Sequence, residues 1–159
     1  MTLASTLGRA VALLDGCGVA HMIAGSVAGI QYSFARTTQD IDIVVQLDEA
    51  SLRCLLLGAE DAGFYVPEQS ARDALDRRDQ FNLIDLRLGW KVDLIVQKDR
   101  PFSRIEFDRR RRVSIEGVEV HIATVEDIIL SKLEWAKAGE SDRQLRDVSN
   151  ILETSAGLI

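Results

Sequence analysis

The 159-residue sequence has few cysteines and histidines and no long apolar run, and each shortage excludes a class of protein. No apolar stretch approaches the ~20 residues that a membrane-spanning helix requires. The first residues show no basic region followed by a hydrophobic segment, so we expect no signal peptide and a cytoplasmic protein. Neither the cysteines nor the histidines stand at the spacing of a metal site, which argues against structural zinc. We therefore predict that Cys17 and Cys54 are reduced, buried thiols and that His21 and His121 are structural.

Positive charge is also scarce. The formal net charge of −6 argues against broad, nonspecific nucleic-acid binding. One basic run, from Arg109 to Arg112, departs from this balance. It indicates either a solvated entry to a strand or an edge that contacts phosphate beside an acidic site, and the run itself does not decide between them.

The most informative segment is a pair of aspartates at the front of an apolar run of isoleucine and valine. Asp40 and Asp42 stand two residues apart, and strand side chains alternate between faces, so both should point to the same side. Ile41, Ile43 and Val45 would then face a core. Neighbouring carboxylates repel each other and burial adds to the cost, so we infer that a divalent cation, Mg²⁺ or Mn²⁺, offsets it.

Two further segments would complete such a site. A lone acid, Asp93, alternates with apolar residues in the second strand of a predicted hairpin. Asp85, in the first strand of that hairpin, is the other candidate for the third acid of the site. The alternative interpretation of Asp85 is a strand residue that faces solvent. Gly25 and Ser26 join a short buried strand to a predicted helix over 27–34. That arrangement is typical of a phosphate cradle, because glycine allows close approach and a helix start offers unpaired N–H groups.

The order of the predicted elements indicates a single domain of the α/β (α+β) class that spans 1–159. We expect a mixed, twisted sheet of about five strands flanked by helices. Its core would occupy about 19–122, and a short C-terminal helical segment would occupy 124–153.

Taken together, these residues resemble the nucleotidyltransferase fold of the DNA polymerase beta-like superfamily. The chain more closely resembles its small bacterial branch, which includes AbiEii-type toxins of toxin–antitoxin systems. The likeness runs from about 19 to 152. In chain order it rests on Gly25, Ser26, Arg36, Thr38, Asp40, Asp42, Asp93, Lys132, Arg146 and Asp147.

The resemblance implies an enzyme of the 2.7.7 type, which moves a nucleoside monophosphate from a nucleoside triphosphate to a hydroxyl acceptor by a two-metal mechanism. The catalytic residues, which would also hold Mg²⁺ or Mn²⁺, are Asp40, Asp42 and Asp93. The residues expected to bind the nucleotide are Gly25, Ser26, Arg36, Thr38 and Lys132. A surface ion pair is the alternative for Lys132 and Arg36. The acceptor would be RNA (tRNA above all), a protein or a small molecule, with an antitoxin or a second copy of the chain as partner and no membrane.

Two other functions remain open from the sequence. The first is a noncatalytic module that binds nucleotide or a partner in a toxin–antitoxin or two-chain nucleotidyltransferase system. Retained triphosphate binding without product would identify it. The second is a hydrolase that uses the same carboxylates on a phosphoester, which would release free nucleoside monophosphate.

Overall fold

The computed structural model describes residues 3–25, 40–139 and 141–155, and within them seven strands form one mixed sheet. The strand order across the sheet is β3-β4-β5-β2-β1-β7-β6. The strands are β1 (His21–Ala24), β2 (Asp40–Val45), β3 (Phe64–Tyr65), β4 (Gln80–Asp85), β5 (Lys91–Val96), β6 (Arg111–Ile115) and β7 (Val118–Ile122). The predicted mixed sheet is confirmed, with more strands than expected. Strand β3 has only two residues, too few to show an alternating pattern.

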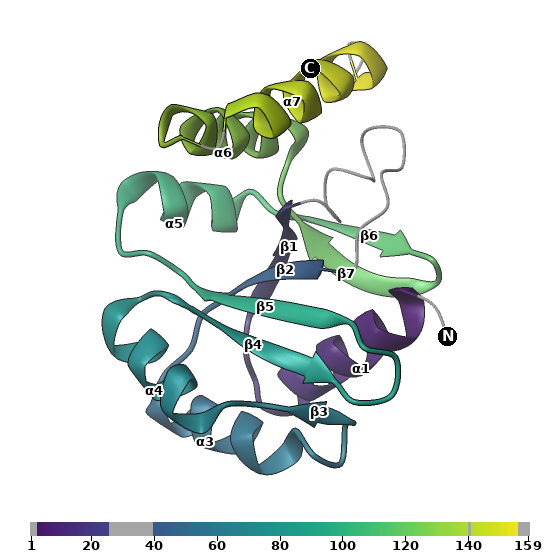
Figure 1. The fold of residues 1–159 in the computed structure, drawn as a ribbon, viewed down its shortest axis with the longest axis vertical. Helices are drawn as coiled ribbons and strands as arrows, with labels where there is room; N and C mark the ends of the chain where they lie inside the picture. Colours follow the sequence, from purple (N-terminus) through teal and green to yellow (C-terminus); the bar gives the residue numbers. More distant parts are fainter. Residues whose placement is uncertain (1–2, 26–39, 140, 156–159) are drawn as a thin grey trace.

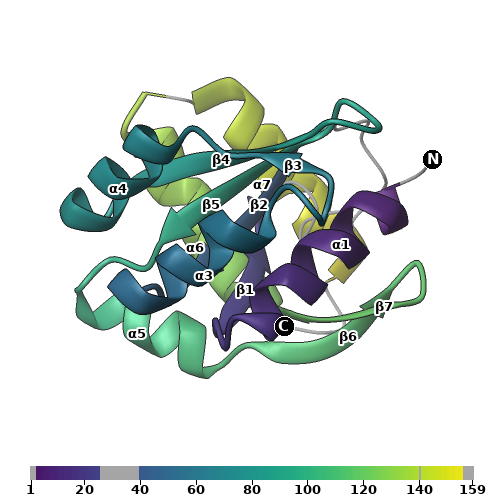
Figure 2. The same cartoon turned by 90° about the horizontal axis from the view of Figure 1, so that it is seen from below.

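Helices cover both faces of this sheet. The described helices are α1 (Leu3–Gly16), α3 (Glu49–Gly58), α4 (Glu68–Arg77), α5 (Pro101–Asp108), α6 (Val125–Lys137) and α7 (Ser141–Ser155). In Figure 1, α6 and α7 lie at one end of the molecule beyond α5, and α3 and α4 lie at the opposite end. Figure 2, seen from below, shows α1 and α3 in front of the strands and α6 and α7 behind them. Within these described ranges, none of the helices has the length and apolar character needed to cross a bilayer.

Strand β2 has one apolar and one polar face, as its alternating sequence predicts. Ile41, Ile43 and Val45 are fully buried and belong to the core that also contains Leu7 of α1 and Leu52 of α3. The intervening positions are exposed or half-buried. The aspartates of β2 are therefore directed away from this core, toward the side of the sheet covered by α5, α6 and α7.

Helix α1 is tied to the sheet by a buried polar contact that the sequence did not reveal. Asp85, the last residue of β4, is only 1% exposed and accepts hydrogen bonds from Thr6 at 2.5 Å and Arg9 at 2.6 Å. Arg9 also donates to the carbonyl of Ala62. The solvent-facing alternative for Asp85 is wrong, because this strand position falls on the buried face together with Phe81 and the helix above it supplies two donors.

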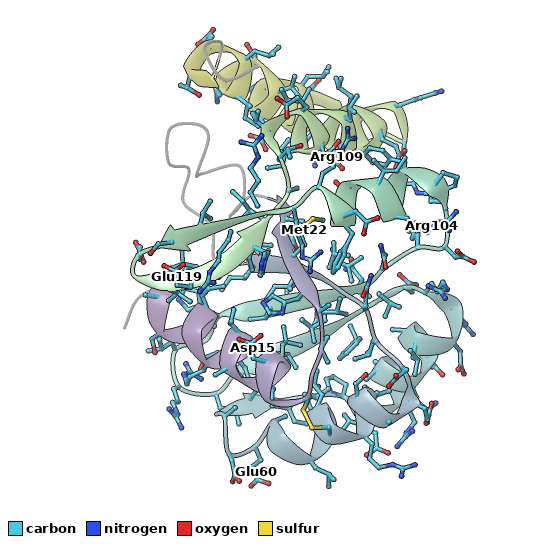
Figure 3. All side chains as sticks on the ribbon, turned by 180° about the vertical axis from the view of Figure 1, so that it is seen from behind. Asp15, Met22, Glu60, Arg104, Arg109 and Glu119 are labelled. Carbon is cyan, nitrogen blue, oxygen red and sulfur yellow. A yellow bond between two sulfur atoms is a disulfide. The ribbon has the colours of Figure 1, made fainter. Side chains whose placement is uncertain are left out.

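The prediction of reduced thiols is also wrong. Cys17 and Cys54 form a disulfide with a Cα–Cα distance of 5.7 Å (Figure 3). Cys17 directly follows α1, and Cys54 lies within α3. The two helices contact each other beneath the sheet, and this packing brings the cysteines together across 37 positions of sequence. No local pattern of spacing encodes such a pairing.

Candidate active site

Parallel pairing of β2 with β5 places two aspartates side by side. In the register of these strands, Asp42 is opposite Asp93, and Asp40 is opposite Lys91. Paired residues on neighbouring strands point to the same face of a sheet, so the three acids share one surface. Asp93 is buried, Asp42 is half-buried, and Asp40, at the start of β2, is exposed. The structure thus brings together all three acids selected from the sequence.

Gly25 fits closely against this acidic pair. It directly follows β1 and has a backbone φ of +61°, a conformation that favours glycine. A Cβ atom at this position would lie 1.9 Å from Oδ2 of Asp42, well inside contact distance. The absence of a side chain at Gly25 therefore leaves the space that the Asp42 carboxyl group occupies.

The two aspartates on adjacent strands perturb each other. Burial, together with the charge of Asp93 and a hydrogen bond to it, raises the pKa of Asp42 from 3.8 to about 7, against the opposing charge of Lys132. Burial also raises the pKa of Asp93, which Lys91 and the hydrogen bond from Asp42 oppose. Without a cation, the pair is therefore best satisfied by sharing a proton.

One atom of the pair points to a cation. Oδ1 of Asp93 is buried and has no hydrogen-bond partner among the residues that the structure describes. Such an atom is costly unless something supplies positive charge or a donor, and carboxylate oxygens are the ligands that Mg²⁺ prefers. In the chain as described, no three His, Cys, Asp or Glu side chains already stand in a ready-made metal cluster. The donor set fits a divalent ion whose remaining ligands come from water or phosphate, as is usual for Mg²⁺.

Lys132 reaches the site from α6. Its side chain is buried, and Nζ donates to Oδ2 of Asp147 on α7 at 2.9 Å. Its charge also lowers the pKa of Asp42, so it faces the acidic pair. The surface ion pair considered from the sequence is wrong in one respect: Lys132 is paired, but the pair is held inside the structure between two helices.

These residues line a cleft of about 470 Å³ between the sheet and the C-terminal helices. The sheet side carries Gly25, Asp42 and Asp93, and the helical side carries Glu106 of α5 and Lys132 of α6. A cleft of this size is within the range of small-molecule and cofactor sites. It joins the acidic pair to a second group of polar side chains on α5 and α6.

The second polar group centres on Glu106. Its Oε2 accepts a hydrogen bond from Ser131 at 2.9 Å, and burial raises the pKa of its carboxyl group against that bond. Within the described ranges it makes no ion pair, because the neighbouring Arg100 is engaged in two hydrogen bonds with Glu134, at 2.7 and 3.0 Å. Glu106 is therefore a partly desolvated acceptor that lines the cleft, and no described cation pairs with it directly.

Sequence reasoning did not select Lys91, Glu106 or Gln144. Lys91 stands two positions before Asp93, so the period of two could have placed it on the same face. Glu106 and Gln144 line the cleft only because α5 and α7 fold over the sheet, and no motif marks them. Three residues that were selected, Ser26, Arg36 and Thr38, lie outside the described residues.

The arginine run contributes mainly to structure. Arg109 pairs with the buried Asp127 at 2.9 Å, and Arg112 pairs with Glu119 at 3.3 Å. Arg110 stacks over the ring of Phe107 at 4.2 Å and donates to its carbonyl. Figure 3 shows Arg109 near the base of the C-terminal helices. These contacts favour the alternative of a strand entry over that of a phosphate-contacting edge.

No protein-family model and no curated protein matches this sequence. Solved structures do match over nearly the whole chain. An antigenic nucleotidyltransferase-like protein from Paracoccidioides brasiliensis is 21% identical with a TM-score of 0.65, over 94% of this chain and 75% of that one. The lincosamide antibiotic adenylyltransferase LnuA, bound to lincomycin, is 13% identical with a TM-score of 0.62, over 95% and 96%. ANT(2'')-Ia in complex with adenylyl-2''-tobramycin is 16% identical with a TM-score of 0.64, over 96% and 89%.

At these identities the likeness establishes the fold. The chain has the mixed α/β architecture of nucleotidyltransferases, as the sequence predicted. Its acidic pair, the adjoining glycine and the cleft are features of this chain itself, and any activity has to be argued from them.

Proposed function

We propose that this protein is a metal-dependent nucleotidyltransferase that moves a nucleoside monophosphate from a nucleoside triphosphate to a hydroxyl group. The observation that carries the proposal is the pairing of Asp42 with Asp93 in the lining of a cleft, where one buried Asp93 oxygen lacks a hydrogen-bond partner within the described ranges. Such a pair is costly in a protein that has no cation to bind there. The nucleotidyltransferase fold of the structural neighbours supports the same reaction class.

The acids would hold the metal. Asp40 and Asp42 on β2 and Asp93 on β5 present carboxylate oxygens to one surface, and these would hold Mg²⁺ or Mn²⁺. When bound, such ions polarise phosphate oxygens and lower the pKa of an attacking hydroxyl. Asp93 lines the cleft together with Glu106 of α5, and its carboxylate would accept the proton of the acceptor hydroxyl.

The remaining site residues would bind the triphosphate. Gly25 would bind phosphate through its backbone, and because it has no side chain the Asp42 carboxyl group can lie directly against it. Lys132 would contribute positive charge, held in place by Asp147, to the charge that develops on the leaving phosphates. Ser26, Arg36 and Thr38 stay proposed nucleotide-binding residues on the strength of the sequence motif alone.

The acceptor is proposed to be a small molecule bearing a hydroxyl group. Among the structural neighbours, LnuA is a lincosamide antibiotic adenylyltransferase bound to lincomycin, and ANT(2'')-Ia is in complex with adenylyl-2''-tobramycin. The cleft wall formed by Glu106 and Ser131 offers an acceptor and a hydroxyl suited to such a compound. A tRNA acceptor, with the toxin role and antitoxin partner that go with it, is the second proposal, and it rests on the sequence resemblance.

The test is a transfer assay with each α-³²P-labelled nucleoside triphosphate and Mg²⁺, against total tRNA, lincomycin, tobramycin or no acceptor. Asp93→Asn should lower transfer on the order of 100-fold or more, because the variant loses a metal-binding charge. Asp108→Asn is the matched control. It removes an exposed carboxyl group on α5 that is not part of the site, and its activity should equal that of the wild type.

Each outcome has a distinct meaning. Label on a small molecule would establish the transferase and its acceptor, and label on tRNA would favour the toxin-like function. Labelled nucleoside monophosphate released to water would identify a hydrolase. Triphosphate binding that yields no product with any acceptor would overturn catalysis and leave the noncatalytic module.

A further inference from the structure

Helix α7 keeps two large apolar side chains in solvent. It buries Val148 and Ile151 against the rest of the chain, whereas Leu145 is 49% exposed and Leu152 is 46% exposed. Figure 1 shows α7 at the extreme end of the molecule, beyond α6, where its outer side meets no other described element. A second protein surface could therefore reach these leucines.

The exposed side of α7 carries an ordered pattern. Leu145 and Leu152 are seven residues apart, so they lie within about 20° of each other around the helix. Arg146 and Glu153 are also seven apart and lie roughly 100° further round on the same exposed side. Ser149, a small residue, lies between the two rows in both angle and height.

The two charged residues of this pattern make no ion pair with any other residue that the structure describes. Arg146 and Glu153 are exposed, and neither is among the ion pairs of the described residues. Lys132 takes the neighbouring acid, Asp147, on the inner side of the helix. Helix α7 therefore presents Arg146 in its first half, one turn after the exposed Asp142, and Glu153 toward its end, beside the leucine row.

We propose that α7 packs antiparallel against α7 of a second copy of this chain, around a two-fold axis that passes near Ser149. Such an axis places Leu145 opposite Leu152 of the second copy and Arg146 opposite Glu153 of the second copy, each contact occurring twice. The leucine pair is centred just before Ser149 and the charge pair just after it, so one axis serves both. A parallel pairing would set Arg146 against Arg146, which the charges disfavour.

The contact between two copies of α7 would be small, and we expect a weak association. A helix of 15 residues is about 22 Å long, and a pair of such helices buries less than the ~1,000 Å² expected of a stable interface. The dimer is therefore weak and should form only as the protein concentration rises. This inference does not depend on the proposed function, because it concerns the outer side of α7 and not the cleft.

Sedimentation velocity of the full chain over about 5 to 500 μM tests the proposal, since weak interfaces are populated in that range. The weight-average mass should rise from the monomer value of 17.6 kDa toward twice that value. Arg146→Glu or Glu153→Arg alone sets like charges opposite each other and should raise the dissociation constant about tenfold or more. Combining both changes restores opposite charges and should return association to near the wild-type level.

Leu57→Ser on α3 is the control, because Leu57 is 78% exposed at the other end of the molecule. This variant should associate as the wild type does. All the charge changes are at exposed positions, and circular dichroism would verify that each variant is folded. A wild type that stays monomeric up to the highest concentration would overturn the proposal. So would a dimer that the single charge reversals leave unchanged, or one that the double reversal fails to restore.

Discussion

At the scale of single residues, Gly25 is the position where one added methyl group would disturb the site most. Gly25→Ala would place a Cβ 1.9 Å from Oδ2 of Asp42 and force a left-handed backbone on alanine. We expect transfer activity to fall on the order of 100-fold, because the displaced carboxyl group would no longer hold the metal in place. Steady-state kinetics, with circular dichroism to monitor folding, would measure this.

The variant Gly18→Ala tests the effect of backbone strain alone, without the displacement of a site side chain that Gly25→Ala would cause. Gly18 also has a positive φ, +68°, but a Cβ there would meet nothing within 4 Å. Its substitution should cost stability on the order of 1 kcal/mol and leave kcat/KM unchanged. Equal loss of activity in the two variants would contradict the role given to Gly25.

In the metal-free protein, the free energy of unfolding should depend on pH because of Asp42. Because its pKa rises from 3.8 to about 7 on folding, the folded state keeps a proton that the unfolded chain releases within that window. The free energy of unfolding should therefore fall as the pH rises from about 4 to about 7, by up to roughly 4 kcal/mol. Asp42→Asn should flatten this dependence and be the more stable protein at neutral pH, while losing activity.

Urea unfolding of both proteins in a chelator, over pH ~4.5 to ~8, would measure the difference. Adding Mg²⁺ near neutral pH should stabilise the wild type more than the variant, since a ligand that binds only the folded state shifts the equilibrium toward it. Parallel curves for the two proteins across the window would show that Asp42 carries no such proton.

At the scale of elements, the contact of Asp85 with Arg9 and Thr6 holds α1 against β4. Burial opposes ionisation of Asp85, but hydrogen bonds from Thr6, Arg9 and the N–H groups of Arg87 and Leu88 outweigh it and lower its pKa to about 2. Asp85→Asn should lower the free energy of unfolding at neutral pH by about 3 kcal/mol, because it leaves the Arg9 charge without its partner. Its activity per folded molecule should be retained.

The lowered pKa of Asp85 determines how its contribution to stability changes with pH. The contribution of Asp85 is present above its unfolded value of 3.8 and is lost as the pH falls toward 2. The gap between wild type and Asp85→Asn in urea melts should therefore narrow between pH ~4 and ~2. Asp108→Asn serves again as the control, and a variant at position 85 as stable as this control would contradict the anchoring role.

Local rules captured most of the elements and part of the site. The alternation of Asp40 and Asp42 with buried isoleucines predicted which face β2 turns to the core. Thr124 caps α6 by accepting a hydrogen bond from the Asp127 N–H, another contact between residues close in sequence. The structure places Asp93 beside Asp42 and places Asp85 on the other face of the sheet, so Asp93 stays the proposed third acid. Period and capping are read within a few residues, which is why these features were accessible.

At the scale of the whole molecule, what sequence reasoning missed depends on contacts between distant segments. The pairing of β2 with β5, the Lys132–Asp147 bond and the position of Glu106 in the cleft all depend on how separate elements pack. The Cys17–Cys54 bond is of the same kind. The type of a residue can make it a candidate for a site, but only the fold determines which candidates come into contact.

The disulfide also sorts the site residues into two groups, those between the two cysteines in the sequence and those after them. It closes a covalent ring that contains Gly25, Asp40 and Asp42, while Asp93 and Lys132 belong to the open chain that follows. An oxidised chain that loses its tertiary structure keeps the first group confined within the ring and releases the second. The acidic pair is therefore reassembled at a single seam, when β5 pairs along β2.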